Sequence, residues 1–260
     1  MKVDLVGKKA LITGGSRGIG AATATALAKA GASVAIFGRD IESLKNQKEK
    51  LEIFGNVVEI FPCDVLDPLQ VTMSWQELET IWGGVDILIN NVGGGGRWGS
   101  EDILQTPSIT WDEVLRKNLG VAVQLTTACL PYMKKNNWGR VVTITSIYGV
   151  TVGGRPWFNV AKVAQTTLTR SLARNFDFSR NGITFNSIAP GAIYIEGTGW
   201  DEMRQNSPDA FNEFIDNLPL GRMGKPEEVA ALALFICSKE ASYLNGSSIT
   251  MDGGESISLN

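Results

Sequence analysis

The 260-residue sequence contains no histidine, and this absence removes several classes of catalytic site. Ser-His-Asp and Cys-His nucleophile systems, zinc-protease helices and haem sites with a proximal histidine all require an imidazole. Proton transfer must therefore use tyrosine, lysine, serine, a carboxylate or cysteine. Cysteine is also scarce, because Cys63, Cys129 and Cys237 are only three and widely spaced. They fit neither a disulfide framework nor a zinc site, so we expect reduced thiols, no metal site and a cytoplasmic protein.

Long apolar segments and an excess of positive charge are missing as well. No uncharged apolar run reaches the roughly 18 residues that indicate a membrane span, and the N-terminal residues form no apolar signal core. Lysine and arginine number 24 against 27 aspartate and glutamate, for a net charge of -3. No cationic field thus favours nucleic acid or an anionic membrane, and we expect neither partner.

Glycine is abundant, with 29 residues, and glycine-rich turns separate alternating strand-like and helix-like patterns. The expected strands are 9–13, 33–37, 57–61, 85–89, 140–145, 183–188 and 247–251. The expected helices are 18–30, 41–54, 68–82, 110–135, 157–179 and 226–238. This alternation predicts an α/β protein with one doubly wound parallel sheet and helices on both faces, a single Rossmann-type domain over residues 1–260. The stretch at about 191–217 has no clear periodicity and is expected to be a substrate lid.

A glycine-rich turn, Thr13-Gly14-Gly15-Ser16-Arg17-Gly18-Ile19-Gly20, joins the first strand to the first helix. Helix N-termini in this position offer free N–H groups to a pyrophosphate. Arg39 follows the second strand, where a basic residue favours the 2′-phosphate of NADP and an acidic residue the ribose of NAD. We therefore expect NADP rather than NAD, with Arg17 and Arg39 at the phosphate. In the alternative, Arg39 is solvated and Asp40 caps a helix.

The order and spacing of motifs along nearly the whole chain resemble the short-chain dehydrogenase/reductase family, in its ketoacyl-reductase-like subgroup. The motifs are Thr13–Gly20, Cys63-Asp64-Val65, Asn90-Asn91-Val92-Gly93, Asn118, Ser146, Lys162, Pro190-Gly191, Arg222-Met223-Gly224-Lys225-Pro226-Glu227-Glu228-Val229-Ala230 and Asp252-Gly253-Gly254. The resemblance implies a nicotinamide cofactor and a homotetramer or homodimer. It places Asp64 and Val65 at the adenine. The implied cofactor-binding residues are Gly14, Ser16, Arg17, Gly18, Ile19, Gly20, Arg39, Asp64, Val65, Asn91, Val92, Gly93, Lys162, Pro190, Gly191 and Ile193.

The family's catalytic residues are Asn, Ser, Tyr and Lys, with the tyrosine four residues before the lysine on one helix face. Asn118, Ser146 and Lys162 match this pattern, but Phe158 occupies the tyrosine position. The tyrosine hydroxyl protonates the carbonyl as hydride arrives, so its loss costs roughly 10²- to 10⁴-fold in rate. The loop before Phe158 is one residue shorter than the family pattern, which makes Thr145 an alternative for the serine.

Three interpretations of Phe158 remain open. The chain is an inactivated variant of a reductase, a natural enzyme in which Tyr148 or, behind it, Tyr194 substitutes, or a natural cofactor-binding protein without catalysis. Without the motif, Phe158 would be a core aromatic residue and Lys162 a solvated lysine. We favour an NADP(H)-dependent oxidoreductase that interconverts a ketone and a secondary alcohol, impaired by Phe158.

The substrate is expected between residues 93–98, the loop 148–157 and the lid. These segments are rich in aromatic side chains, which favours a ring-containing or apolar carbonyl or alcohol substrate. The aromatic residues are Trp98, Trp157, Tyr194, Trp200, Phe211 and Phe214. Arg97 and Arg155 either bind a carboxylate or phosphate of the substrate or are solvated.

Overall fold

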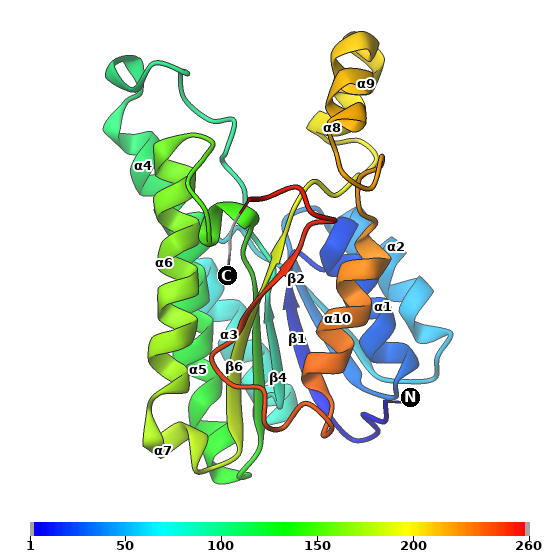
Figure 1. Ribbon diagram of the computed structural model, residues 1–260. Helices are drawn as coiled ribbons and strands as arrows, with labels where there is room; N and C mark the ends of the chain where they lie inside the picture. Colours follow the sequence, from blue (N-terminus) through cyan, green and yellow to red (C-terminus); the bar gives the residue numbers. More distant parts are fainter. Residues whose placement is uncertain (1–2, 258–260) are drawn as a thin grey trace.

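A single parallel sheet carries the fold. The computed structural model describes residues 3–257, and within them seven strands pair in the order β3-β2-β1-β4-β5-β6-β7 (Figure 1). They are β1 (Lys9–Thr13), β2 (Ser33–Gly38), β3 (Val58–Pro62), β4 (Ile87–Asn90), β5 (Gly139–Ile144), β6 (Ile183–Pro190) and β7 (Ser248–Met251). Every neighbouring pair is parallel. The predicted doubly wound sheet is confirmed, and each predicted strand overlaps an observed one.

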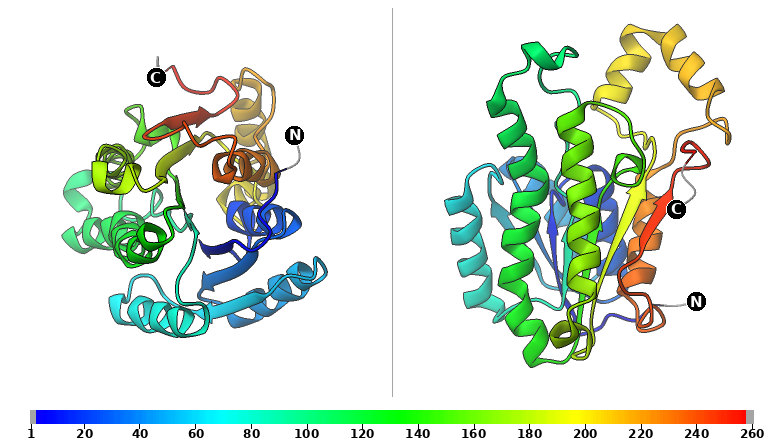
Figure 2. Two further views of the ribbon diagram at one scale, coloured as in Figure 1. Left: turned by 90° about the horizontal axis from the view of Figure 1, so that it is seen from below. Right: turned by 60° about the vertical axis from the view of Figure 1, so that its left-hand side comes forward.

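Helices cover both faces of the sheet (Figures 1 and 2). One face packs against α1 (Gly18–Lys29), α2 (Ile41–Glu52) and α10 (Pro226–Cys237), the other against α3 (Pro68–Trp82), α5 (Val121–Lys135) and α6 (Pro156–Ala173). Side chains alternate accordingly: Ala10 and Ile12 belong to the first core and Leu11 to the second. Strands buried on both faces read as continuous apolar runs, which is why the sequence predicted them well.

Two predicted helices are interrupted. The helix expected over 110–135 is α4 (Ser108–Leu115), a π-helical turn (Arg116–Gly120) and α5. The side chain of Asn118 donates to the carbonyl of Val114, four residues earlier, and thus takes the acceptor of a regular helical bond. The helix expected over 157–179 ends with α6, and α7 (Phe176–Ser179) begins after Asn175, whose side chain caps it.

The expected lid is not structureless, which corrects the prediction for 191–217. It contains α8 (Gly199–Asn206) and α9 (Pro208–Asp216), which project beyond the sheet (Figure 1). Both helices are short and amphipathic, and two turns are too few for periodicity to stand out in the sequence.

In the part of the chain that the structure describes, no helix is long and apolar enough to cross a membrane.

The topology locates the site. The strand order reverses between β1 and β4, so the loops after these two strands leave in opposite directions and open a crevice at the carboxyl edge of the sheet. Two segments overhang this edge in Figure 1: the loop from β4 to α4 on one side, and α8 with α9 on the other.

Candidate functional site

The glycine-rich turn after β1 has the backbone shape that its sequence demands. Gly14 and Gly18 have φ angles of 65° and 56°, which disfavour any side chain. A Cβ on Gly20 would lie 2.2 Å from the carbonyl oxygen of Gly14, so the third glycine lets α1 pack against the turn. Arg17 is the N-cap of α1 and makes no side-chain capping bond. The N–H groups at the start of α1 therefore face the crevice without a capping side chain.

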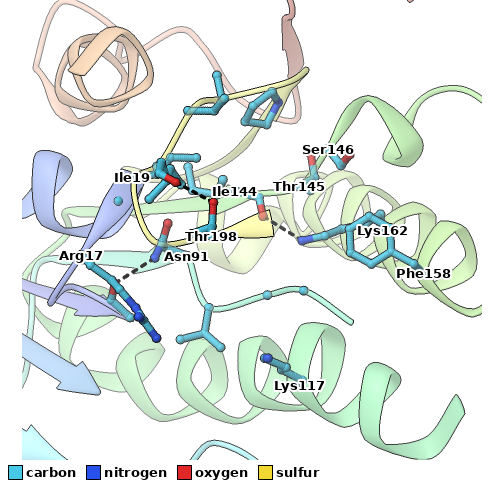
Figure 3. Close-up of a pocket in the computed structure, with 18 of the residues that line it drawn as sticks. Arg17, Ile19, Asn91, Lys117, Ile144, Thr145, Ser146, Phe158, Lys162 and Thr198 are labelled. Carbon is cyan, nitrogen blue, oxygen red and sulfur yellow. Dashed lines mark hydrogen bonds between the residues drawn. The ribbon is translucent and has the colours of Figure 1, made fainter. Parts of the chain in front are cut away.

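The loop after β4 is hydrogen-bonded to this turn. Thr13 Oγ1 accepts bonds from the N–H groups of Asn91 and Val92, each at 2.9 Å. Asn91 Nδ2 donates to the carbonyls of Thr13 and Gly14 at 2.8 and 3.3 Å (Figure 3). These bonds join the loops after β1 and β4, the two strands between which the strand order reverses.

The end of β2 separates its two charged residues. The side chain of Asp40 caps α2 by accepting bonds from the N–H groups of Glu42 and Ser43. Arg39 is exposed and lines the crevice together with Arg17. Asp40 is thus a helix cap, as in the alternative interpretation, and the contact of Arg39 with a 2′-phosphate stays a prediction.

A cavity of about 540 Å³ lies at this edge, within the range of roughly 300–1,000 Å³ typical of ligand sites. The predicted site residues that line it are Gly14, Arg17, Gly18, Ile19, Arg39, Asn91, Val92, Gly93, Ser146, Phe158, Lys162, Pro190, Gly191 and Ile193. Thr145, the predicted alternative to Ser146, lines it too, as do Gly94 of the predicted substrate loop and Ile195, Thr198 and Trp200 of the predicted lid; only Lys117 and Ile144 were not predicted.

Five predicted residues lie outside this lining: Ser16, Gly20, Asp64, Val65 and Asn118. The carboxylate of Asp64 accepts a bond from the N–H of Leu66, and Val65 is buried. The contact of Asp64 and Val65 with an adenine stays a prediction.

Phe158 and Lys162 lie one turn apart on α6 and both face the cavity (Figure 3). The Nζ atom of Lys162 is 5.6 Å from the centre of the Phe158 ring and donates to the carbonyl of Ile144 and to Gln165 Oε1. A Cβ on Gly93 would come within 2.8 Å of that Nζ, so this glycine admits the lysine head. The predicted juxtaposition on one helix face is confirmed.

Ser146 and Thr145 both line the cavity, but their hydroxyls differ in use. Thr145 Oγ1 donates its proton to the carbonyl of Ile188, whereas Ser146 Oγ accepts a bond from the N–H of Tyr148. The Ser146 proton is therefore available to donate to a ligand oxygen. This favours Ser146 over Thr145 for the role of holding a carbonyl.

Asn118 is fully buried and saturated by backbone groups. Its side chain donates to the carbonyls of Gly94 and Val114 and accepts from the N–H of Gly94. Its own carbonyl accepts a bond from Gln165 Nε2, and Gln165 in turn accepts from Lys162. A glutamine thus connects Asn118 and Lys162. The sequence offered a signal, because residues three apart on a helix share a face.

Burial, with a smaller contribution from the nearby Lys117, lowers the pKa of Lys162 to about 7. Lysine in an unfolded chain keeps its proton to about pH 10. From about pH 7 upward, the folded chain has therefore lost a proton that the unfolded chain still binds. Stability contributed by this group rises with pH over that window, by up to about 1.4 kcal/mol per pH unit.

We expect the Lys162→Met variant to lack this rise. The measurement is urea unfolding of the cofactor-free chain at about pH 7, about pH 8 and about pH 9. The difference in the free energy of unfolding between parent and variant isolates Lys162, because the contributions of the other titrating groups cancel. The parent should gain stability relative to the variant as the pH increases. Parallel profiles would show that Lys162 keeps an ordinary pKa in the folded chain.

Two tyrosines were considered as replacements for the missing hydroxyl. Tyr194 is engaged, because its hydroxyl donates to Asp201 at 2.6 Å, and this bond raises the pKa of the phenol. The Tyr148 ring lies edge-on to Phe158, with ring centres 6.3 Å apart, and its hydroxyl makes no hydrogen bond to the described residues. Tyr148 does not line the cavity, although its ring contacts Phe158, which does.

Glycine conformations and side-chain contacts shape the loop after β4. Gly94 and Gly95 have φ angles of 118° and 93°, and a Cβ on Gly96 would lie 3.3 Å from the Phe158 ring. Arg155 Nη1 donates to the carbonyls of Trp98 and Gly99, so this arginine holds the loop and is not solvated.

The charges of the cavity fit a phosphorylated dinucleotide. Arg17, Arg39, Lys117 and Lys162 line it, and no carboxylate does. Burial lowers the pKa of Lys117, and its cationic neighbours Arg39 and Arg17 add to this effect, whereas the nearby Asp64 opposes it. Together with the glycine turn, the cations match a ligand with several phosphate charges.

A Rossmann-type sheet, a glycine turn and a cationic crevice at the strand-order switch define a dinucleotide-binding α/β protein. A family model described as "Enoyl-(Acyl carrier protein) reductase" matches residues 14–256. The 3-oxoacyl-[acyl-carrier-protein] reductase of Aquifex aeolicus is 34% identical over 258 residues, covering 98% of this chain and 99% of the relative. The chain therefore belongs to the short-chain dehydrogenase/reductase family of oxidoreductases, as its motifs predicted.

Solved structures agree with this assignment. L-sorbose reductase from Gluconobacter frateurii, in complex with NADPH and L-sorbose, matches with a TM-score of 0.90 and 30% identity over 100% of both chains. A 3-oxoacyl (acyl-carrier-protein) reductase from Agrobacterium tumefaciens C58 with NADP bound has a TM-score of 0.88 and 32% identity, covering 96% of this chain and 95% of that one.

Proposed function

We propose that this protein binds NADP(H) and is built to interconvert a ketone and a secondary alcohol by hydride transfer, with proton transfer impaired by Phe158. The observation that carries the proposal is the cavity in which Ser146, Lys162 and Phe158 meet beside the cationic crevice. Of the family's catalytic groups, Ser146 and Lys162 line this cavity, Asn118 is buried outside its lining, and only the tyrosine hydroxyl is missing from the chain. The NADP-bound and NADPH-bound structural relatives support the cofactor.

Each side chain has a defined task in this proposal. Bound nicotinamide supplies the hydride for reduction or accepts it in oxidation. Ser146 donates a hydrogen bond to the carbonyl oxygen and so fixes it in the cavity. Lys162, held by Ile144 and Gln165, places its ammonium beside the cofactor and near the position of the reacting oxygen. The benzene ring of Phe158 has no proton to give, so protonation of that oxygen is the slow step.

The remaining predictions extend this picture. We propose one domain over residues 1–260, with α8 and α9 as the substrate lid; Ile195, just before them, already packs on Gly18 of the glycine turn. Homo-oligomeric assembly and a cytoplasmic location stay predictions. The competing proposal is a cofactor-binding protein without catalysis, which the same crevice would also serve.

Replacing Arg39 by alanine tests the cofactor. We expect affinity for NADPH to fall about 10- to 100-fold, while NADH binding changes by less than about twofold, since only NADPH carries the 2′-phosphate. Fluorescence titration of the reduced nicotinamide measures both. Lys45→Ala is a matched control, because Lys45 is an exposed cation on α2 that pairs with Glu42. Tighter binding of NADH than NADPH to the parent chain would contradict the choice of NADP.

A further inference from the structure

Arg97 lies beside the cavity, over the lining residue Trp200, although it does not line the cavity itself. It belongs to the loop after β4, and its guanidinium reaches the start of α8, where a Cβ on Gly199 would lie 1.4 Å from Nη1. Its Cζ is 5.5 Å from the centre of the Trp200 ring, and Trp200 lines the cavity. The glycine at 199 is therefore what admits the arginine between the two overhanging segments.

The two arginines near the substrate side differ in their partners. Arg155 donates to two carbonyls of the loop and lies 3.9 Å from Glu101. The guanidinium of Arg97 has no hydrogen-bond or ion-pair partner among residues 3–257. Its planar set of N–H donors is exposed at the cavity mouth and free to bind a ligand.

The carboxylate next to Trp200 is not available to neutralise Arg97. Asp201, next to Trp200, is buried and accepts bonds from the Tyr194 hydroxyl, the N–H of Gly197 and Arg204. No carboxylate lines the cavity either. A free cation here lies over an aromatic wall, because Trp200 packs against Phe214 with ring centres 4.5 Å apart.

We propose that Arg97, with the Trp200–Phe214 pair, forms a specificity subsite for an anionic group of the carbonyl substrate, a carboxylate or a phosphate. The inference rests on the proposed function and names its substrate class: an oxo compound with an anionic end beyond an apolar or aromatic part. Arginine pairs with both anions through two parallel hydrogen bonds, which fixes the orientation of the substrate as well as its charge. The carbonyl then lies at the inner end, toward Ser146.

The test is calorimetric titration of the NADPH-loaded chain, in which Phe158 keeps turnover slow enough for binding to be measured. The probes are 4-acetylbenzoate and its methyl ester, in which the carboxylate or ester lies beyond the ring from the ketone, so that they share ring and ketone and differ in charge. We expect the acid to bind about 10- to 100-fold more tightly than the ester. Arg97→Met should remove that preference and leave ester binding within about twofold.

Arg180→Met is the matched control, since Arg180 also stacks on an aromatic ring, Phe176, but at the opposite edge of the sheet. It should change nothing. Titration of 3-oxobutanoyl-CoA distinguishes a phosphate from a carboxylate. If Arg97→Met weakens binding of this thioester only, the subsite binds a phosphate. If it weakens binding of the acid, the subsite binds a carboxylate.

Any of three results would overturn the subsite. The first is equal affinity for acid and ester, together with a thioester affinity that does not change in Arg97→Met. The second is an equal loss of affinity for all probes in Arg97→Met, which would mean that Arg97 only orders the lid, and the third is binding of NADPH but of none of the oxo compounds. Failure of NADPH itself to bind would instead refute the proposed function on which the subsite rests.

Discussion

Replacing Phe158 by tyrosine should raise the rate of ketone reduction with NADPH by about 10²- to 10⁴-fold, equivalent to about 3–5 kcal/mol of transition-state stabilisation. The ring already lies in the cavity wall one helical turn from Lys162, so the substitution adds a hydroxyl without moving the backbone. In its protonated form, Lys162 would lower the pKa of the new phenol below its usual value of about 10. Fold and cofactor affinity should stay unchanged.

The loss of NADPH absorbance with a panel of ketones, including the oxo acid and ester above, measures this gain. Phe158→Leu should stay at the level of the parent chain, because it also lacks a proton. Combining Phe158→Tyr with Lys162→Met should remove most of the gain. If Phe158→Tyr binds NADPH and reduces no ketone of the panel, the reductase proposal is wrong and the non-catalytic cofactor-binding protein is favoured.

Tyr148 provides a separate arm of the same experiment. If the parent chain reduces ketones at an appreciable rate and Tyr148→Phe abolishes it, the Tyr148 hydroxyl is a surrogate acid. The ring is enclosed by Gly153 and Gly154, where added Cβ atoms would lie 2.5 and 3.2 Å from it. Our proposal predicts a slow parent and no effect of Tyr148→Phe, since the hydroxyl does not reach the cavity lining.

Replacing Trp157 by alanine should lower the free energy of unfolding by about 3–5 kcal/mol. This side chain is fully buried and packs against Val114, Ala161 and the ring of Trp111, 5.8 Å away between centres. Its Nε1 atom also donates to the carbonyl of Gly95 at 3.3 Å. The variant would leave a large cavity between α4 and α6 and release the substrate loop from its anchor.

Urea unfolding followed by circular dichroism measures the loss, with Trp157→Phe as a control that keeps most of the ring and loses the hydrogen bond. That control should cost about 1–2 kcal/mol. Because Gly95 belongs to the substrate loop, oxo-compound binding should weaken more than NADPH binding in Trp157→Ala. A loss below about 1 kcal/mol would mean that the small cluster around Trp157 contributes little to the fold.

The parallel sheet, the glycine turn and the position of Phe158 relative to Lys162 could be predicted from the amino-acid sequence. These features depend on local periodicity: apolar runs make buried strands, and residues four apart on a helix share a face. For the same reason, each predicted strand begins and ends within about two residues of the observed strand. The short helices α8 and α9 and the π-helical turn escaped, since neither produces a periodic pattern long enough to detect.

The role of each side chain depends on contacts that form only when the chain folds. Arg39 lines the crevice whereas Asp40 caps α2, and the Tyr194 hydroxyl donates to Asp201 on α8. Gln165 reaches Asn118 across 47 positions of sequence, and the pKa of Lys162 falls because distant segments bury it. Such partners and burial come from chain segments that meet only on folding. The sequence specified which chemical groups are present, and packing determined which of them are free to act.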